Sequence, residues 1–128
     1  MKDQAAQLCL PQQSAIDAYG NGGFRFAGMS HKGSILTLPS GMYAWDFGVI
    51  TDLSLEQLAP ILAEADQLDV FLLGTGVDLW RPDEAVFQAF RDQNIIFDCL
   101  STGSAARTYN VMIGEQRAVG CGLVAIDG

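Results

Sequence analysis

The last quarter of the chain constrains its fold most strongly, because a helix between two strands can be placed there from the residue pattern. Residues 101–104 read Ser-Thr-Gly-Ser and form a turn between the apolar run 95–100 and a segment with helical periodicity over 102–116. One face of that helix is expected to bury Ala105, Ala106, Tyr109, Met112 and Ile113. The apolar run 118–126 then follows as a final buried strand. A strand, a turn, a helix and another strand in this order are typical of α/β domains.

The segment before this quarter repeats the same alternation. The continuous apolar run 69–73 indicates a strand covered on both faces. Pro82 marks the start of the helix that follows, and Asn94 is expected to end it in the left-handed conformation. Because strand–helix–strand crossovers are right-handed, the runs 70–73 and 95–100 are expected to be parallel neighbours or near neighbours.

An earlier helix is indicated by Ser54 and Gln57, whose spacing fits a capping box. Pro60 falls inside this segment and allows two alternatives. Either the helix begins near Ala59, or it begins at the capping box and bends at Pro60 with the loss of one hydrogen bond. Its apolar face is expected to contain Leu55, Leu58, Leu62 and Ala65.

The first half of the chain predicts antiparallel β structure. Residues 16–19 and 24–28 flank the turn Gly20-Asn-Gly-Gly23, and residues 34–38 and 42–47 flank Pro39-Ser-Gly41. Both are hairpin signals, because glycine adopts the positive φ that tight turns require. In the second hairpin, Tyr43, Trp45 and Phe47 are expected on one face. Residues 1–13 lack periodicity and are expected to form a flexible N-terminal arm, with residues 14–128 as a single α/β domain that contains a mixed sheet.

The charge of the chain argues against nucleic acid as a partner. With 7 Lys and Arg against 15 Asp and Glu, the net charge of the 128-residue chain is −8, which repels nucleic acids and anionic membranes. The N-terminus resembles neither a signal peptide nor a transit peptide, and no apolar run is long enough to span a bilayer. The sequence therefore predicts a cytoplasmic protein without membrane insertion.

The few chemically reactive residues do not form a recognisable catalytic motif. Cys9, Cys99 and Cys121 are odd in number and far apart, and His31 is the single histidine. Buried free thiols are therefore expected at Cys99 and Cys121, and no metal or other cofactor is predicted. The serines at 101 and 104 lack a nucleophile elbow, and a Ser/His triad is not indicated.

Two motifs in the second half resemble a known family. One is Asp69-Val-Phe-Leu-Leu-Gly-Thr-Gly76, and the other runs from Ser101-Thr-Gly103 through Thr108-Tyr-Asn110 to Glu115 and Arg117. Together with 41–45 they are similar to a small α/β family of unknown biochemical function. Its relatives include the mitochondrial respiratory complex I assembly factor three and the adipogenesis-associated protein.

The resemblance extends over about residues 14–126, and it implies a three-layer α/β fold with a central mixed sheet and an extra β layer. It also implies a role in protein assembly for the mitochondrial relatives and supplies no catalytic residues. Because a transit peptide is not seen, the chain resembles the bacterial branch of the family.

Candidate ligand-binding residues follow the two predicted parallel strands. Ligands of α/β sheets bind at the carboxyl ends of such strands, and the second loop also opens a helix whose free amides could hold an anion. Residues of this type also end strands and cap helices in any α/β fold, so a purely structural role is the alternative. The candidates are Gly74, Thr75, Gly76, Ser101, Thr102, Gly103, Ser104 and Arg107.

Trp80 and Arg81, in the loop after Gly76, are candidate partner-binding residues, because tryptophan and arginine concentrate at interaction hot spots. A tryptophan that covers the end of the sheet is the alternative. The leading hypothesis from the sequence is a non-enzymatic protein-interaction or assembly module with an unidentified protein partner. The second is a small-molecule or anion-binding protein, including an enzyme, that uses loops 74–76 and 101–104. An open edge of the hairpin sheet would also allow a homo-oligomer.

Overall fold

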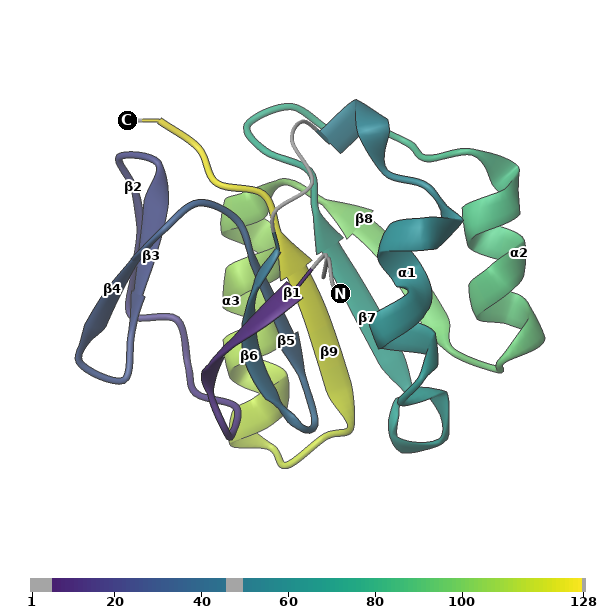
Figure 1. Cartoon of the computed structure of the whole chain (residues 1–128), viewed down its shortest axis with the longest axis horizontal. Coiled ribbons are helices and arrows are strands. Elements are labelled where there is room, and N and C mark those ends of the chain that lie inside the picture. The colour runs from purple at the N-terminus through teal and green to yellow at the C-terminus, as the bar shows by residue number, and fades with distance from the viewer. Residues whose placement is uncertain (1–5, 46–49, 128) are drawn as a thin grey trace.

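The computed structural model of the chain describes residues 6–45 and 50–127. A six-stranded mixed sheet lies at its centre, with the strand order β1-β6-β5-β9-β7-β8 (Figure 1). Helices α1 (Leu55–Leu62) and α2 (Glu84–Asp92) cover one face of this sheet. Helix α3 (Thr102–Gly114) and a separate three-stranded sheet cover the other face. The predicted α/β architecture, with a mixed central sheet and an additional N-terminal β portion, is confirmed.

The antiparallel half of the central sheet is built on the second predicted hairpin. Strands β5 (Ile35–Leu38) and β6 (Gly41–Trp45) pair as predicted, while Phe47 lies outside the described residues. Met42 and Trp45 point to opposite faces of the sheet and are buried in the two separate apolar clusters.

Residues 6–10 differ from the expected flexible arm. They form strand β1 (Ala6–Leu10), which pairs antiparallel with β6. The side-chain amide of Gln13 adds two further bonds, to the Thr37 hydroxyl at 3.0 Å and to the Val119 carbonyl at 2.8 Å. These partners are distant in sequence, so the local residue pattern does not predict them. The arm therefore covers the outer strand of the hairpin, and residues 1–5 lie outside the described part.

The parallel half contains the two strands predicted as neighbours. Strand β7 (Val70–Gly74) pairs in parallel with β8 (Ile96–Leu100) on one side and with β9 (Val119–Leu123) on the other. Strand β9 also pairs antiparallel with β5, so it joins the two halves of the sheet. Strand β8 lies at the edge, and its Ile96 is 64% exposed.

Helix α1 begins with the predicted capping box, in which the Gln57 side chain accepts a hydrogen bond from the Ser54 backbone amide at 2.9 Å. Pro60 lies inside the helix, so the alternative start near Ala59 is wrong. Leu58 and Ile61 are its buried residues, whereas Leu55 is 51% exposed, contrary to the expected face. The short 3-10 helices η1 (Ile50–Asp52) and η2 (Ala65–Gln67) precede and follow α1.

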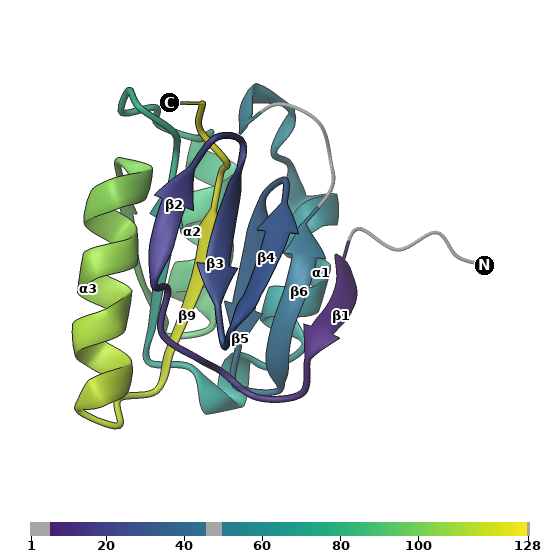
Figure 2. The same cartoon turned by 90° about the vertical axis from the view of Figure 1, so that its left-hand side faces the viewer.

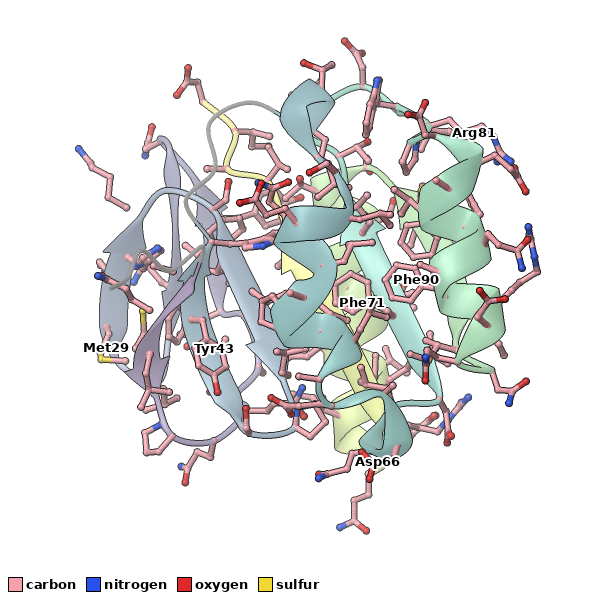
Figure 3. All side chains as sticks on the ribbon, turned by 45° about the vertical axis from the view of Figure 1, so that its right-hand side comes forward. Met29, Tyr43, Asp66, Phe71, Arg81 and Phe90 are labelled. Carbon is pink, nitrogen blue, oxygen red and sulfur yellow. The ribbon has the colours of Figure 1, made fainter. Side chains whose placement is uncertain are left out.

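Helix α2 begins at Glu84, two residues after Pro82, and Asn94 has a φ of 60°, as expected of a left-handed cap. Phe90 of α2 and Phe71 of β7 stack between helix and sheet with ring centroids 5.4 Å apart (Figure 3). Phe97 of β8 stacks on Phe90 in turn, at 4.3 Å. This aromatic stack fixes α2 over the β7–β8 pair.

Glycines in β9 make room for two of the large aromatic side chains. A Cβ atom at Gly122 would clash with the indole ring of Trp45, and one at Gly120 would lie 3.0 Å from the ring of Phe71. The central strand therefore alternates small and large residues so that the neighbouring strands can fill the core.

The three-stranded sheet comprises β2 (Ala18–Gly20), β3 (Gly23–Phe26) and β4 (Met29–Lys32), all antiparallel. It lies beside α3 and in front of β9 and β5 (Figure 2). The hairpin of β2 and β3 is the first predicted one, whereas β4 was not predicted, because its Met-Ser-His-Lys sequence carries little strand signal.

Side chains of α3 attach the segment before β2 to the rest of the domain. The Asn110 amide accepts the Ile16 amide proton at 2.8 Å and donates to the Ile16 carbonyl at 2.9 Å. The Tyr109 hydroxyl donates to the Ser14 carbonyl at 2.8 Å. Residues of the Thr108-Tyr-Asn110 motif thus connect the two β portions.

Candidate functional site at the strand ends

The candidate loops lie together at the carboxyl ends of β7 and β8. Gly74 is the last residue of β7 and is in register with Leu100, the last residue of β8. The Thr75 amide donates to the Leu100 carbonyl at 2.8 Å, and Ser101 is the N-cap of α3. The topology therefore brings the candidate residues of 74–76 and 101–104 side by side, as the sequence predicts.

Hydrogen bonds within the protein occupy much of this site. The Gly76 amide donates to the Thr102 hydroxyl at 3.0 Å, and the Thr102 amide donates to the Gly76 carbonyl at 2.9 Å. The Thr102 hydroxyl in turn donates to the Val124 carbonyl at 2.7 Å. Thr102 is fully buried. This side chain therefore joins the ends of three chain segments and is not available at the surface.

Gly74 and Gly103 are sites of close packing. A Cβ atom at Gly74 would lie 2.9 Å from the Thr102 Cα and 3.2 Å from the Ala105 Cβ, so glycine allows α3 to approach β7. A Cβ atom at Gly103 would clash with the Tyr19 hydroxyl. Tyr19 of β2 therefore lies against the first turn of α3, a contact between distant segments that the residue pattern does not predict.

The first turn of α3 keeps a positively charged neighbour. The Ser104 amide donates to the Ser101 hydroxyl at 3.3 Å, which completes the N-cap. The Arg107 guanidinium donates to the Ser104 hydroxyl at 3.4 Å. Ser101, Ser104 and Arg107 are thus close enough to act on one ligand, and the helix dipole would favour an anion there. Binding by these residues remains a prediction.

Thr75 organises the loop that carries Trp80. Its hydroxyl donates to the Asp78 carbonyl at 2.8 Å and accepts the Trp80 amide at 3.1 Å. Trp80 is half-buried and packs against the apolar cluster under α1 and α2. In the same loop Val77 is 71% exposed and Leu79 is 69% exposed. Sequence reasoning missed these two residues, although apolar side chains among Gly, Asp and Pro were a usable signal.

Arg81 lies over an aromatic ring at the surface of α2. Its guanidinium carbon is 4.0 Å from the centroid of Phe87, and Arg81 Nη2 is 3.6 Å from Glu84 Oε1 (Figure 3). Glu84 also accepts a hydrogen bond from Arg91 at 2.6 Å, and this bond is the main reason that the pKa of Glu84 lies below its usual value. These contacts hold Arg81 at one end of the exposed loop.

The thiols differ in their surroundings. Burial raises the pKa of Cys99 to about 11, and it raises the pKa of the fully buried Cys121 further. Cys9 Sγ lies 3.9 Å from His31 Nδ1, and His31 Nε2 lies 3.2 Å from the Ser34 carbonyl oxygen. The fold thus brings together one cysteine and the histidine that the sequence places far apart. In the described ranges, no three His, Cys, Asp or Glu side chains gather as metal ligands.

None of the helices in 6–45 and 50–127 has the length and apolar character to cross a membrane. The compartment therefore stays a prediction.

The chain is similar in sequence to a bacterial protein and to a mammalian protein. An uncharacterized protein of Rhodobacter capsulatus is 34% identical over 113 residues, which cover 88% of this chain and 86% of the relative. The mouse NADH dehydrogenase [ubiquinone] 1 alpha subcomplex assembly factor 3 is 28% identical over 119 residues, which cover 93% of this chain. The match spans 64% of the mouse protein's own length.

Among solved structures, an outer membrane protein from Bartonella henselae superimposes with a TM-score of 0.89 and 45% identity. That match covers 93% of this chain and 100% of the other. The resemblance seen in the two sequence motifs is confirmed by a family model, described as a protein of unknown function (DUF498/DUF598), which matches residues 16–124. This chain therefore belongs to the DUF498/DUF598 family.

Proposed function

We propose that this chain is a non-enzymatic protein-interaction module that acts in the assembly of a larger protein complex. The support from relatives is that several members of similar sequence are named as assembly factors for NADH dehydrogenase. The proposal includes a cytoplasmic location and a protein partner, and it includes neither nucleic-acid binding nor membrane insertion.

One observation suggests which surface would bind the partner. Val77 and Leu79 are 71% and 69% exposed, on a loop that Thr75 holds in place through its hydrogen bonds to Asp78 and Trp80. We call Val77, Leu79, Trp80 and Arg81 the loop patch. Apolar side chains on an ordered loop lose little conformational entropy on binding, which favours their use in an interface. Trp80 and Arg81 belong to the residue types that contribute most binding energy at interfaces.

A groove lies beside the loop patch, on the same side of the molecule. It has a volume of about 390 Å³ and lies between α2 and the edge strand β8, where Phe87, Phe97 and Arg91 line it. Arg81 over Phe87 connects the loop patch to this groove. The free edge of β8 offers backbone groups that a partner strand could pair with. A partner protein that covers both would bury apolar and aromatic surface together.

The test is affinity capture of the tagged full chain from its native cell, followed by mass spectrometry of the captured proteins. We expect Leu79→Asp to lose a partner that the unmodified chain and Val111→Asp both retain. Val111 is a matched control, because it is 59% exposed on α3, away from the loop patch. Circular dichroism would check that all three proteins fold. Recovery of the same proteins with the unmodified chain and both variants, or recovery of the chain alone, would reject the loop patch.

A second candidate function is anion binding at the first turn of α3, and the Arg107–Ser104 contact favours it. A thermal-shift screen of anions tests this alternative. A ligand present at 100 times its dissociation constant should add about 2.7 kcal/mol to the free energy of unfolding. This gain should be reduced in both Ser104→Ala and Arg107→Ser. If no anion raises the melting temperature of the unmodified chain, this candidate fails.

A further inference from the structure

The three-stranded sheet lies at the opposite end of the molecule from α2 (Figures 1 and 2). A hollow of about 410 Å³ is lined by residues of this sheet. The strand register explains which residues share its outer face. Arg25 of β3 lies between Ala18 of β2 and Ser30 of β4, and Gly23 lies between Gly20 and Lys32. In β3, Phe24 and Phe26 alternate with these residues and are buried, so the opposite face of this strand packs on the core. The outer face therefore combines a floor of small residues with a guanidinium, an ammonium and a hydroxyl group.

The floor is hollow because it lacks side chains. Ala18, Gly20 and Gly23 contribute at most one methyl group each. At Gly23 the absence of a side chain is required, since a Cβ atom there would clash with the His31 carbonyl oxygen of β4. Close approach of β3 and β4 thus depends on this glycine, and the same residue leaves space above the sheet.

Within residues 6–45 and 50–127, the two cations of this hollow have no ion-pair partner. Among the described residues, Arg81 and Arg91 pair with Glu84, and Arg117 pairs with Glu115. Arg25 and Lys32 make no ion pair in this part of the chain, although acidic residues outnumber basic ones by 15 to 7. Two positive charges on one face of a protein of net charge −8 create a local positive potential that would attract an anion.

We propose that this hollow binds a small molecule that carries two adjacent anionic groups, either phosphates or carboxylates. Arg25 Nη1 donates to the Ser30 hydroxyl at 3.0 Å, which orients the guanidinium and leaves its other N–H groups free for an oxyanion. Lys32 supplies the second positive charge, and Asn21 adds an amide at the rim. A volume of about 410 Å³ lies within the range of small-molecule sites.

The carboxylate of Asp127 lies near the turn whose Asn21 and Gly23 line the hollow, and it allows a test with the opposite expected effect. The Gly22 amide donates to the Ile126 carbonyl at 2.8 Å, which holds the C-terminal segment beside the turn between β2 and β3. Asp127 Oδ1 lies 3.7 Å from the position of a Cβ atom at Gly22. This carboxylate would repel a bound anion, so Asp127→Asn should strengthen binding whereas loss of Arg25 or Lys32 should weaken it.

The experiment is isothermal titration of the full chain with pyrophosphate and with citrate, at constant ionic strength. Pyrophosphate tests the phosphate source of the charge and citrate the carboxylate source. We expect at least one of them to bind with a dissociation constant no weaker than millimolar. Arg25→Ser and Lys32→Ser should each weaken that binding about tenfold or more, as expected for a lost charge-assisted contact. Arg117→Ser is the control, because it removes the same charge from an exposed position far along the chain.

Two results would overturn the proposal. One is that neither probe binds at millimolar concentration. The other is that binding survives in the double variant of Arg25 and Lys32 but is lost in Arg107→Ser, which would assign the anion to the first turn of α3. Amide chemical shifts of Gly20, Gly23 and Ser30 locate the ligand independently of any variant. Because this face does not contain the loop patch, failure here would leave the proposed partner-binding function untouched.

Discussion

Gly76 and Thr102 are joined by two hydrogen bonds in opposite directions, each contributed by one backbone amide. The Gly76 amide donates to the Thr102 hydroxyl at 3.0 Å, and the Thr102 amide donates to the Gly76 carbonyl at 2.9 Å. The same hydroxyl reaches the Val124 carbonyl, so one buried side chain holds the ends of β7, β9 and α3 together. The loops predicted to bind a ligand are, at their centre, a structural junction.

Replacing Thr102 by valine should therefore destabilise the protein. Valine has nearly the same shape but leaves the Gly76 amide and the Val124 carbonyl without their buried partner. The free energy of unfolding should fall by about 2 to 4 kcal/mol, measured by urea denaturation. Thr108→Val is the control, because the Thr108 hydroxyl donates to the Ser104 carbonyl of its own helix and joins no separate segments among the described residues. Equal losses in both variants would contradict the proposed junction.

Alanine at two glycines should change stability in opposite directions. At Gly74 the added methyl group would lie 2.9 Å from the Thr102 backbone, so α3 must move and the protein should lose about 1 to 3 kcal/mol. At Gly114, the last residue of α3, nothing lies within 4 Å of the added methyl group. Alanine there should raise the free energy of unfolding by up to about 1 kcal/mol. Thermal and urea unfolding of both variants measure the two changes in stability. A loss of stability in Gly114→Ala would show that α3 packs differently at its end.

Stability should decline in alkaline solution because the folded state favours the neutral forms of the buried Cys121 and Tyr109 and of the half-buried Cys99. Burial raises the pKa of Cys99 from 9.0 to about 11, and it also raises the pKa values of Cys121 and Tyr109. A raised pKa in the folded state means that the unfolded state loses its proton first. The stabilisation is thus complete below about pH 9 and is lost as the pH rises toward 11 and beyond.

Urea unfolding between pH 7 and pH 11 measures this decline. Cys121→Ala should flatten it, because that variant removes one of the ionising groups. Alkylation by iodoacetamide at pH 8 supplies a second readout. Cys121, which is fully buried and whose pKa is raised by that burial, should react last of the three thiols. Stability that is constant up to pH 11 would contradict the burial of these groups.

The extent to which the sequence predicts this molecule depends on how local each signal is. The parallel pairing of β7 and β8 follows from two apolar runs joined by one helix, and the capping box of Ser54 and Gln57 is contained in four residues. Strand β1 pairs with β6, and Tyr19 lies on Gly103, through contacts between distant segments that leave no periodic trace. The cationic hollow could not be predicted either. Arg25 and Lys32 share a face only because β4, a strand of mostly exposed residues, completes the small sheet.

The Asn110 side chain should contribute to the attachment of the three-stranded sheet, in addition to the packing of Phe24 and Phe26 in the core. Its amide makes both an accepting and a donating bond to the backbone of Ile16, as a neighbouring strand would. Asn110→Ala should lower the free energy of unfolding by about 1 to 3 kcal/mol, because both backbone groups of Ile16 lose their partner. Hydrogen exchange should accelerate most in residues 14–26, while residues 35–45 should follow only the global change. Val111→Ala, an exposed neighbour on the same helix, should change neither quantity. If exchange in 14–26 and 35–45 accelerated equally in Asn110→Ala, the packing of Phe24 and Phe26 in the core, and not this side chain, would hold the small sheet in place.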